Sequence, residues 1–296
     1  MQLLAIFGPT AVGKTGVAIA VAKLLRARGE RPVAISCDAI QVYRGLEILS
    51  GAATADEQAR LEHRLLGIVP IDGEFSAGRF ANLAHAEIDQ LIAEGATPIL
   101  VGGTGLYMRA ALGELELRPR VPAEIRSKVE REVAERGSAA LHSELTPELA
   151  SGVHPNDAKR IARLTELTRL GIVPHSSSEG LWSEHLRVPA LLVGLTVARE
   201  ELQARIAARI ESMLAFGVEE EVQSAKLAGA SRTARAAIGF EELLAGDPEA
   251  MKRAQWRFAR RQLTWMKRMT DVVQIDRTGR SDEQVSAEVV ARLRRD

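Results

Sequence analysis

The stretch Gly8-Pro9-Thr10-Ala11-Val12-Gly13-Lys14-Thr15 matches the phosphate-binding pattern G-x-x-x-x-G-K-[ST]. An apolar run, Leu3–Phe7, precedes it, and Lys14–Arg28 has the apolar spacing of an amphipathic helix. A strand, a glycine-containing turn and a helix N-terminus together present backbone N–H groups to an anion. We therefore expect all eight residues to bind a di- or triphosphate, with Lys14 as a point charge and the Thr15 hydroxyl as a ligand for Mg²⁺.

Further short apolar runs alternate with helix-length amphipathic stretches along the chain. The predicted strands are Leu3–Phe7, Pro32–Ser36, Pro98–Gly102, Ala190–Leu195 and Val272–Ile275. The predicted helices of the same region are Lys14–Arg28, Ala77–Glu94, Arg199–Phe216 and Pro248–Met269. Apolar strands that alternate with helices form a parallel sheet that is covered on both faces. The expected fold class is therefore α/β, with a P-loop NTPase-like parallel-sheet core.

Between about residues 119 and 187 the pattern changes. Two charged amphipathic helices are expected there, Val121–Arg136 and Asp157–Leu170, and no strand-like run occurs before Ala190. The stretch Gly171–Trp182, rich in serine, is expected to form a surface loop. The predicted division is a P-loop α/β catalytic core of residues 1–118 and 188–296 and a helical insertion domain of residues 119–187 that contacts RNA.

The composition excludes several classes of protein. With 296 residues, 46% hydrophobic and 26% charged, the chain is not disordered, collagen-like or a coiled coil. Its single cysteine, Cys37, excludes a multi-cysteine zinc module and fits a reducing compartment. Neither a signal peptide nor a membrane span is recognisable, so we expect a cytoplasmic monomer without a membrane partner. Because 39 basic residues balance 39 acidic ones, nucleic-acid binding requires local basic clusters.

A candidate catalytic residue follows the strand Pro32–Ser36. Asp38 lies just beyond this strand, at the carboxyl edge of the sheet where α/β folds bind their ligands. Its carboxylate could orient Mg²⁺-bound water or accept a proton from a nucleophile, or it could simply cap a helix. Gln41, one helical turn further on, could bind a base edge or point into solvent.

The strand Pro98–Gly102 ends without the carboxylate that helps to hold Mg²⁺ in many P-loop NTPases. It runs into Gly102-Gly103-Thr104-Gly105, which offers flexible backbone and one hydroxyl. Thr104 is therefore either a ligand group at the edge of the sheet or part of a plain strand-to-helix turn. The missing carboxylate weakens the case for an ATPase.

Two basic clusters are candidate nucleic-acid surfaces. In Lys252–Arg268 every charged residue is basic, and Trp256, Phe258 and Trp265 are interleaved with the charges. The second cluster, Lys159–Arg169, lies in the insertion. Each cluster could follow RNA phosphates, or it could be the solvated face of an amphipathic helix.

Three stretches together are similar to motifs of the bacterial tRNA dimethylallyltransferases, namely Gly8–Thr15, Asp38–Gly45 and Gly102–Tyr107. Later segments resemble that family's motifs in the same order, and these are Arg205-Ile206 with Arg209, Met213 and Gly217, then Ala237–Phe240, then Arg260–Trp265. The resemblance implies transfer of a dimethylallyl group from dimethylallyl diphosphate to the N6 amine of the adenine that is 3′-adjacent to the anticodon. The P-loop would then hold a diphosphate leaving group, with Mg²⁺, rather than ATP undergoing hydrolysis.

The same resemblance implies roles for individual residues. Asp38 and Thr104 would be catalytic, and Arg209 would join the P-loop in binding diphosphate. The implied contacts with the tRNA anticodon stem-loop are Asp38, Ala39, Ile40, Gln41, Thr104, Arg126, Lys159, Arg160, Ile161, Ala162 and Arg163. In the later motifs and the basic run, the expected tRNA contacts are Arg235, Gly239, Arg260, Arg261, Gln262, Trp265 and Lys267. The chain departs from the family's usual pattern at Ala39, Ser50–Thr54 and Glu62–Leu65.

Three other functions are compatible with parts of the sequence. A nucleotide or small-molecule kinase is the main alternative, because P-loop kinases share the first motif and also carry helical lids. A phosphate-binding RNA module without catalysis is another, although Asp38 beside the P-loop argues against it. An enzyme that prenylates free AMP is the third, but two basic clusters exceed what a mononucleotide needs.

Overall fold

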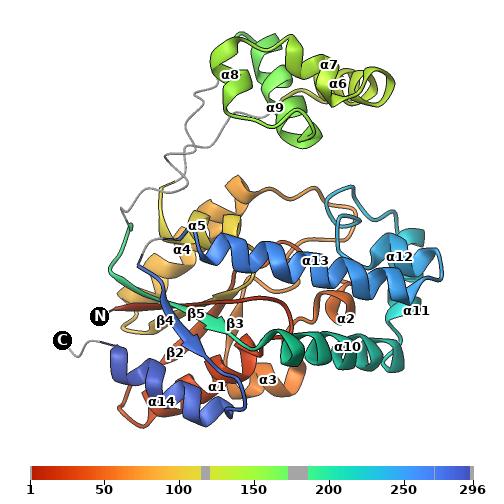
Figure 1. Ribbon diagram of the computed structural model, residues 1–296. Coiled ribbons are helices and arrows are strands. Elements are labelled where there is room, and N and C mark those ends of the chain that lie inside the picture. The colour runs from red at the N-terminus through yellow and green to blue at the C-terminus, as the bar shows by residue number, and fades with distance from the viewer. Residues whose placement is uncertain (1, 115–120, 173–185, 270, 294–296) are drawn as a thin grey trace. The chain divides into compact units, whose positions relative to one another are not determined.

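The computed structural model describes residues 2–114, 121–172, 186–269 and 271–293 (Figure 1). The chain divides into two compact units, one formed by Met1–Leu115 and Trp182–Asp296 and the other by Glu116–Leu181. The loop expected at Gly171–Trp182 lies outside the described residues from position 173 onward, as does the expected boundary at residue 119. Within the described residues, none of the helices has the length and hydropathy needed to cross a membrane.

The first unit is built on a six-stranded parallel sheet in the order β3-β2-β4-β1-β5-β6. Its strands are β1 (Leu3–Phe7), β2 (Pro32–Ser36), β3 (His63–Arg64), β4 (Thr97–Gly102), β5 (Ala190–Thr196) and β6 (Val273–Asp276). Its helices are α1 (Lys14–Arg26), α2 (Glu47–Ser50), α3 (Ala55–Arg60), α4 (Ala77–Ala93), α5 (Gly105–Leu112), α10 (Arg199–Ala215), α11 (Val218–Leu227), α12 (Phe240–Leu244), α13 (Pro248–Met266) and α14 (Asp282–Arg292). The predicted α/β class with a parallel sheet is confirmed.

Alternate residues of the central strand β1 face opposite sides of the sheet, as the period of two in a strand requires. Leu3, Ala5 and Phe7 belong to a hydrophobic cluster that includes helices α4, α5 and α10 to α13. Leu4 and Ile6 belong to a second cluster, with α1 and α14. Figure 1 shows α1 and α14 below the sheet and α13 above it. Both faces are therefore covered, which accounts for strands that are apolar throughout.

Strands β2, β4 and β1 are neighbours, so the segments that follow them meet at one edge of the sheet. The ends of β2 and β4 approach closely. Cys37 N donates to Val101 O at 2.8 Å, and a Cβ on Gly102 would lie 2.2 Å from Cys37 O. Only glycine fits at position 102, which explains why the last residue of β4 has no side chain.

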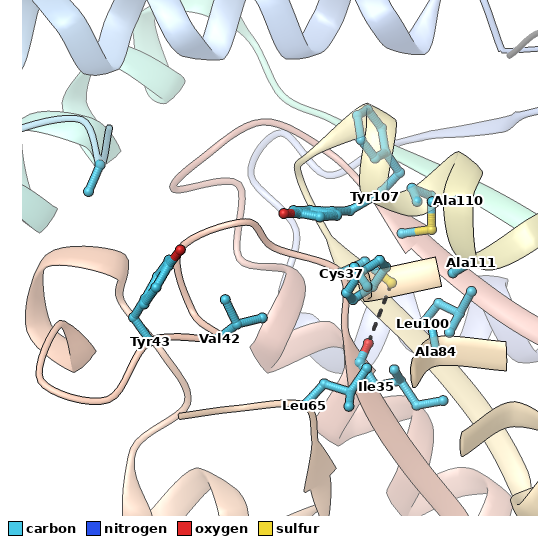
Figure 2. Close-up of a cluster of buried hydrophobic side chains, with 14 of the residues drawn as sticks. Ile35, Cys37, Val42, Tyr43, Leu65, Ala84, Leu100, Tyr107, Ala110 and Ala111 are labelled. Carbon is cyan, nitrogen blue, oxygen red and sulfur yellow. Dashed lines mark hydrogen bonds between the residues drawn. The ribbon is translucent and has the colours of Figure 1, made fainter. Parts of the chain in front are cut away.

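A cluster of buried side chains lies below this edge (Figure 2). Cys37 Sγ donates to Ile35 O at 3.8 Å, and burial raises the pKa of the thiol. The ring centroid of Tyr107 lies 4.5 Å from that of Phe80 and 6.4 Å from that of Phe75. Tyr43 is also buried, and its hydroxyl bonds to Thr233 Oγ1 at 2.6 Å. These aromatic rings belong to the same hydrophobic cluster as Cys37, the residue that follows β2.

The second unit consists of short helices around its own small core. They are α6 (Ala123–Arg136), α7 (Ser138–Ser143), α8 (Pro147–Ser151) and α9 (Ala158–Arg169). The core is formed by Val129, Leu141, Leu149, Val153, Ile161 and Leu164. Arg187, expected at the end of the insertion, instead contacts the first unit, because its backbone N donates to Leu112 O and its guanidinium pairs with Asp89.

Candidate functional site

The P-loop leaves β1 at Gly8 and enters α1 at Lys14. Its backbone has positive φ at two alternate positions, Ala11 (62°) and Gly13 (86°). Left-handed residues that alternate with right-handed ones turn successive N–H groups toward one side and form an anion-binding concavity. Glycine adopts this conformation freely, whereas at Ala11 it costs about 1–2 kcal/mol. The loop therefore accepts backbone strain in a shape that suits phosphate.

Two partly buried cations converge on this loop. Lys14 Nζ donates to Gly8 O at 3.1 Å and to Pro9 O at 3.0 Å. Arg209, from α10, donates to Thr10 Oγ1 at 3.3 Å and to Ser50 O at 3.0 Å. Burial and, secondarily, the charge of Arg209 lower the pKa of Lys14 to about 8, against an opposing effect of Asp38. Burial also lowers the pKa of Arg209. A bound polyanion would relieve the repulsion between these two cations.

Asp38 lies immediately beyond β2, close enough for its carboxylate to favour the charged forms of both Lys14 and Arg209. Its Oδ1 accepts a hydrogen bond from Ile40 N at 2.9 Å. Residues 39–42 form turns rather than the helix assumed in placing Gln41 one helical turn away, so that assumption was wrong. The short-range bond between the Asp38 side chain and the backbone stabilises a turn in place of a helix. It leaves Asp38 at the edge of the sheet beside the P-loop cations.

The amide of Gln41 binds protein groups in this structure. Its Oε1 accepts from Ser36 Oγ at 2.7 Å, and its Nε2 donates to Gly51 O at 3.0 Å and to Ser50 O at 3.5 Å. Ser50 O also accepts from Arg209. Gln41 therefore fixes the segment that positions Arg209, and its expected contact with tRNA stays a prediction. Its neighbours Ala39 and Ile40 are partly exposed at the same edge.

Thr104 is the N-cap residue of α5, and its Oγ1 accepts from Ala39 N at 3.4 Å. This long bond joins the segments that follow β2 and β4. Gln262, from α13, makes a second link at the same edge, since Thr10 N donates to its Oε1 at 2.8 Å and its Nε2 donates to Gly103 O at 2.7 Å. The residue Gln262 is 3% exposed. The structure thus places Gln262, an expected tRNA contact, within the framework of the P-loop.

The basic run of α13 divides into two faces. Arg260, Arg261 and Lys267 are exposed, as a surface for RNA requires. Trp265 is half-buried against Gly105, where an added Cβ would lie 2.4 Å from the indole ring. The guanidinium of Arg261 lies 5.6 Å from the ring centroid of Phe258. The helix is therefore amphipathic, with its charges at the surface and Trp265 packed on α5, and RNA binding by this face stays a prediction.

Two further expected tRNA contacts lie near α12. Arg235 is exposed, pairs with Glu241 at 2.8 Å, and lines an open pocket of about 420 Å³ together with Arg232. Gly239 is buried at a φ of 101°, and a Cβ there would lie 2.9 Å from Met251 Cε. Gly239 therefore allows α12 to pack closely, and the structure assigns it no exposed surface.

In the second unit, Lys159 and Arg160 are exposed at the start of α9. Ile161 is fully buried in the core of this unit, and Ala162 packs partly against it, so the expected surface position of Ile161 is wrong. The amphipathic period of α9 turns Ile161 inward although Lys159 and Arg160 just before it are exposed. The buried carboxylate of Glu166 lies 3.0 Å from Arg163 and 3.9 Å from Arg126. Glu166 thus holds two of the expected RNA contacts.

The structure also identifies residues that sequence reasoning missed. Arg277, which follows β6, donates from one guanidinium nitrogen to Val12 O at 2.6 Å and to Gly13 O at 3.2 Å. The guanidinium of Arg277 also forms an ion pair with the carboxylate of Asp282, at 3.0 Å. Neither residue belongs to a recognisable motif, so only the glycines at positions 13 and 16 hinted that another group approaches the loop.

A magnesium site made of protein groups alone is not formed, because no three His, Cys, Asp or Glu side chains cluster within the described part of the chain. Thr15 lies in the first turn of α1, directly after Lys14. Mg²⁺ commonly keeps several waters and is held by substrate phosphates with one or two protein oxygens. A hydroxyl at the start of α1 and the carboxylate of Asp38 at the same edge of the sheet fit that mode.

Comparison with known proteins identifies the family. The model of the IPP transferase family matches residues 41–269. The chain is similar to the tRNA dimethylallyltransferase of Thermobifida fusca, with 36% identity over 281 residues, 90% of this chain and 87% of that protein. It is similar to that of Anaeromyxobacter dehalogenans strain 2CP-C, with 38% identity, 93% of this chain and 95% of that protein. Among solved structures, the full-length tRNA isopentenylpyrophosphate transferase from Bacillus halodurans matches with a TM-score of 0.69 and 32% identity, over 97% of this chain and 94% of that one. These relatives favour prenyl transfer over the kinase alternative, and the chain belongs to the IPP transferase family.

Proposed function

We propose that this protein is a tRNA dimethylallyltransferase, which transfers a dimethylallyl group from dimethylallyl diphosphate to the N6 amine of the adenine 3′-adjacent to the anticodon. The observation that carries the proposal is the convergence of Lys14, Arg209 and Asp38. Two cations meet at a nest of backbone amides, and a carboxylate lies beside them at the end of β2. An anionic leaving group and a nucleophile that loses a proton require these opposite charges.

In the proposed reaction the bond between C1 of the dimethylallyl group and its diphosphate oxygen breaks, and a bond between C1 and adenine N6 forms. Negative charge grows on the diphosphate as the bond breaks. Lys14, Arg209 and the P-loop amides would stabilise that charge more strongly in the transition state than in the bound substrate. Because these donors are already held in place, little reorganisation is needed when the charge develops.

The attacking amine must lose one proton. Asp38 is the candidate acceptor, because it lies at the edge of the sheet with one carboxylate oxygen fixed by the Ile40 amide. Thr104, linked to Ala39 N across the same edge, would contact the reacting groups from the β4 side. Mg²⁺, held by the Thr15 hydroxyl and by diphosphate oxygens, would supply further neutralisation of the leaving group's charge.

Recognition of tRNA would use exposed basic residues in both units. Arg260, Arg261 and Lys267 on α13, with Lys159 and Arg160 on α9, would bind phosphates of the anticodon stem-loop. The target adenine must leave its base stack for its amine to react, which costs least in a loop. All of these groups belong to one chain, so we propose a monomer that acts where tRNA is found, in the cytoplasm.

The test is incubation of the protein with Mg²⁺, unmodified bulk tRNA and radiolabelled dimethylallyl diphosphate, beside a parallel reaction with γ-labelled ATP. Label in acid-precipitable tRNA that is lost in Asp38→Ala would support the proposal. Consumption of ATP without label in tRNA would overturn it in favour of a kinase. In a third reaction AMP replaces tRNA, and label in AMP but not in tRNA would assign a mononucleotide substrate.

A further inference from the structure

Arg277 approaches the P-loop from β6, at the edge of the sheet. The residue is 5% exposed, and its backbone N donates to Thr196 O at 2.9 Å, which anchors it between β5 and β6. Its guanidinium donates to two successive carbonyl groups of the loop, Val12 O at 2.6 Å and Gly13 O at 3.2 Å. Lys14 donates to other carbonyls, Gly8 O and Pro9 O. The P-loop carbonyls are therefore bound by two separate cations.

The fit between Arg277 and the loop depends on two glycines. A Cβ on Gly13 would lie 2.0 Å from the Arg277 guanidinium, and one on Gly16 would lie 2.1 Å from the Asp282 carboxylate. Asp282 pairs with Arg277 at 3.0 Å. It is also the first residue of α14, where Ser281 caps the helix. The ion pair of Arg277 and Asp282 therefore packs directly against the loop and the first turn of α1.

The contact with Arg277 fixes the direction of two backbone N–H groups of the P-loop. In a planar trans peptide the C=O and N–H groups point in opposite directions. The carbonyls of Val12 and Gly13 share their peptide planes with the N–H groups of Gly13 and Lys14. Arg277 binds both carbonyls, so both N–H groups are directed away from Arg277 and toward the concave side of the loop. A charged donor at the carbonyl also polarises the amide and strengthens its N–H as a donor.

We propose that Arg277 is a positioning residue of the diphosphate site, which orients the Gly13 and Lys14 amides for phosphate from behind the loop and is itself oriented by Asp282. The inference rests on the proposed function only in taking the bound anion to be a diphosphate. Arg277 touches no substrate atom in this arrangement. Its effect should therefore appear in diphosphate affinity and leave tRNA affinity unchanged.

The test measures binding of inorganic pyrophosphate with Mg²⁺ by titration calorimetry, on the full chain, for wild type, Arg277→Gln, Arg277→Lys and Arg280→Gln. Arg280 is the matched control, because it lies in the same turn but donates to Asp276 O and pairs with Glu288. We expect Arg277→Gln to weaken pyrophosphate binding about tenfold, with Arg277→Lys intermediate and Arg280→Gln within about twofold of wild type. In the transfer assay, the KM for dimethylallyl diphosphate should rise while the KM for tRNA stays the same.

Equal pyrophosphate affinity in Arg277→Gln and Arg280→Gln would overturn the inference and leave the pair as a contact that only stabilises the fold. If Arg277→Gln shows no cooperative thermal transition, Asp282→Asn decides. It leaves the arginine in place but removes the carboxylate that orients it, and unchanged pyrophosphate binding there would also overturn the inference. Wild-type protein that binds pyrophosphate but prenylates no tRNA would refute the proposed function alone.

Discussion

The backbone amide of Thr10 donates a 2.8 Å hydrogen bond to Oε1 of Gln262, a residue 252 positions further along the chain. The same side chain donates from Nε2 to Gly103 O at 2.7 Å. One amide group therefore joins the P-loop, the end of β4 and helix α13. The helix that carries the exposed residues Arg260 and Arg261 is thus fixed to the loop expected to bind diphosphate.

Replacement of this amide should affect the diphosphate site more than RNA binding. In Gln262→Leu, the buried Thr10 amide and Gly103 carbonyl lose their partner, which costs about 1–3 kcal/mol for each group. We expect the KM for dimethylallyl diphosphate to rise at least about tenfold while the Kd for tRNA changes little. Steady-state kinetics with each substrate varied in turn, beside filter binding of tRNA, measures both. Arg261→Leu, the exposed neighbour, should give the opposite pattern. If Gln262→Leu instead raised only the KM and Kd for tRNA, Gln262 would be a tRNA contact and not a support of the diphosphate site.

The carboxylate of Asp38 should matter for chemistry and much less for binding. Asp38→Asn keeps an oxygen that can accept from the Ile40 amide, so the turn should persist, but the side chain no longer accepts a proton readily. Single-turnover transfer should slow by about 10²–10⁴-fold, the usual range for loss of a general base. Pyrophosphate affinity should stay within a few-fold of wild type. Asp56→Asn, on the surface of α3, is the control. Turnover unaffected by Asp38→Asn would remove this residue from the mechanism.

The affinity for diphosphate should depend on pH through Lys14. Burial, followed by the charge of Arg209, lowers the pKa of Lys14 to about 8 in the free protein. The ammonium is therefore present below about pH 8 and is lost as the pH rises through that value, so anion binding should weaken in the same direction. Titration calorimetry with pyrophosphate from about pH 6.5 to about pH 9.5, a range that brackets the pKa of Lys14, measures this. Lys14→Gln serves as the reference, because it shares the titration of the probe and of every other group. Parallel curves for the two proteins would contradict the assignment.

The exposed arginines of α13 should contribute to tRNA binding through phosphate contacts. Arg260→Ala and Arg261→Ala should each weaken tRNA binding and reduce the slope of log K against log salt by about one. Filter binding of tRNA at several salt concentrations gives both quantities. Arg292→Ala is the control, since Arg292 lies on α14 at the opposite face of the sheet and pairs with Glu288 at 2.6 Å. A salt slope unchanged by both α13 variants would make this face a solvated surface only.

The second unit contains its own testable ion-pair cluster. Glu166, 5% exposed, faces Arg163 and Arg126. Glu166→Gln removes the shared negative charge, and we expect it to destabilise this unit by roughly 1–3 kcal/mol and to weaken tRNA binding through misplaced arginines. Denaturant unfolding and tRNA binding measure the two effects. Glu144→Gln, which removes an exposed carboxylate paired with Arg136, is the matched control. Loss of stability with unchanged tRNA affinity would limit Arg126 and Arg163 to a structural role.

Local periodicity was enough to place most secondary structure. The strands Leu3–Phe7 and Pro32–Ser36 coincide with their predictions, and α4 and α13 begin at the predicted residues, Ala77 and Pro248. These elements are long enough for the period of the apolar side chains to be read. Strand β3 was missed because two residues cannot show a period. The turn after Asp38 was mistaken for a helix, since a side chain's bond to the nearby backbone leaves no periodic trace.

The sequence by itself determined the P-loop, the parallel α/β core and the positions of Asp38 and Thr104 at strand ends, because each depends on residues adjacent in the chain and on the rule that parallel strands end at a common edge. Only the tertiary structure decided what holds that edge together. Gln262 reaches the P-loop from α13, Arg209 from α10 and Arg277 from the position after β6, across separations of about 200 residues or more. Such contacts arise when the covered sheet brings distant segments together, and no local pattern specifies which polar side chain will meet which backbone group.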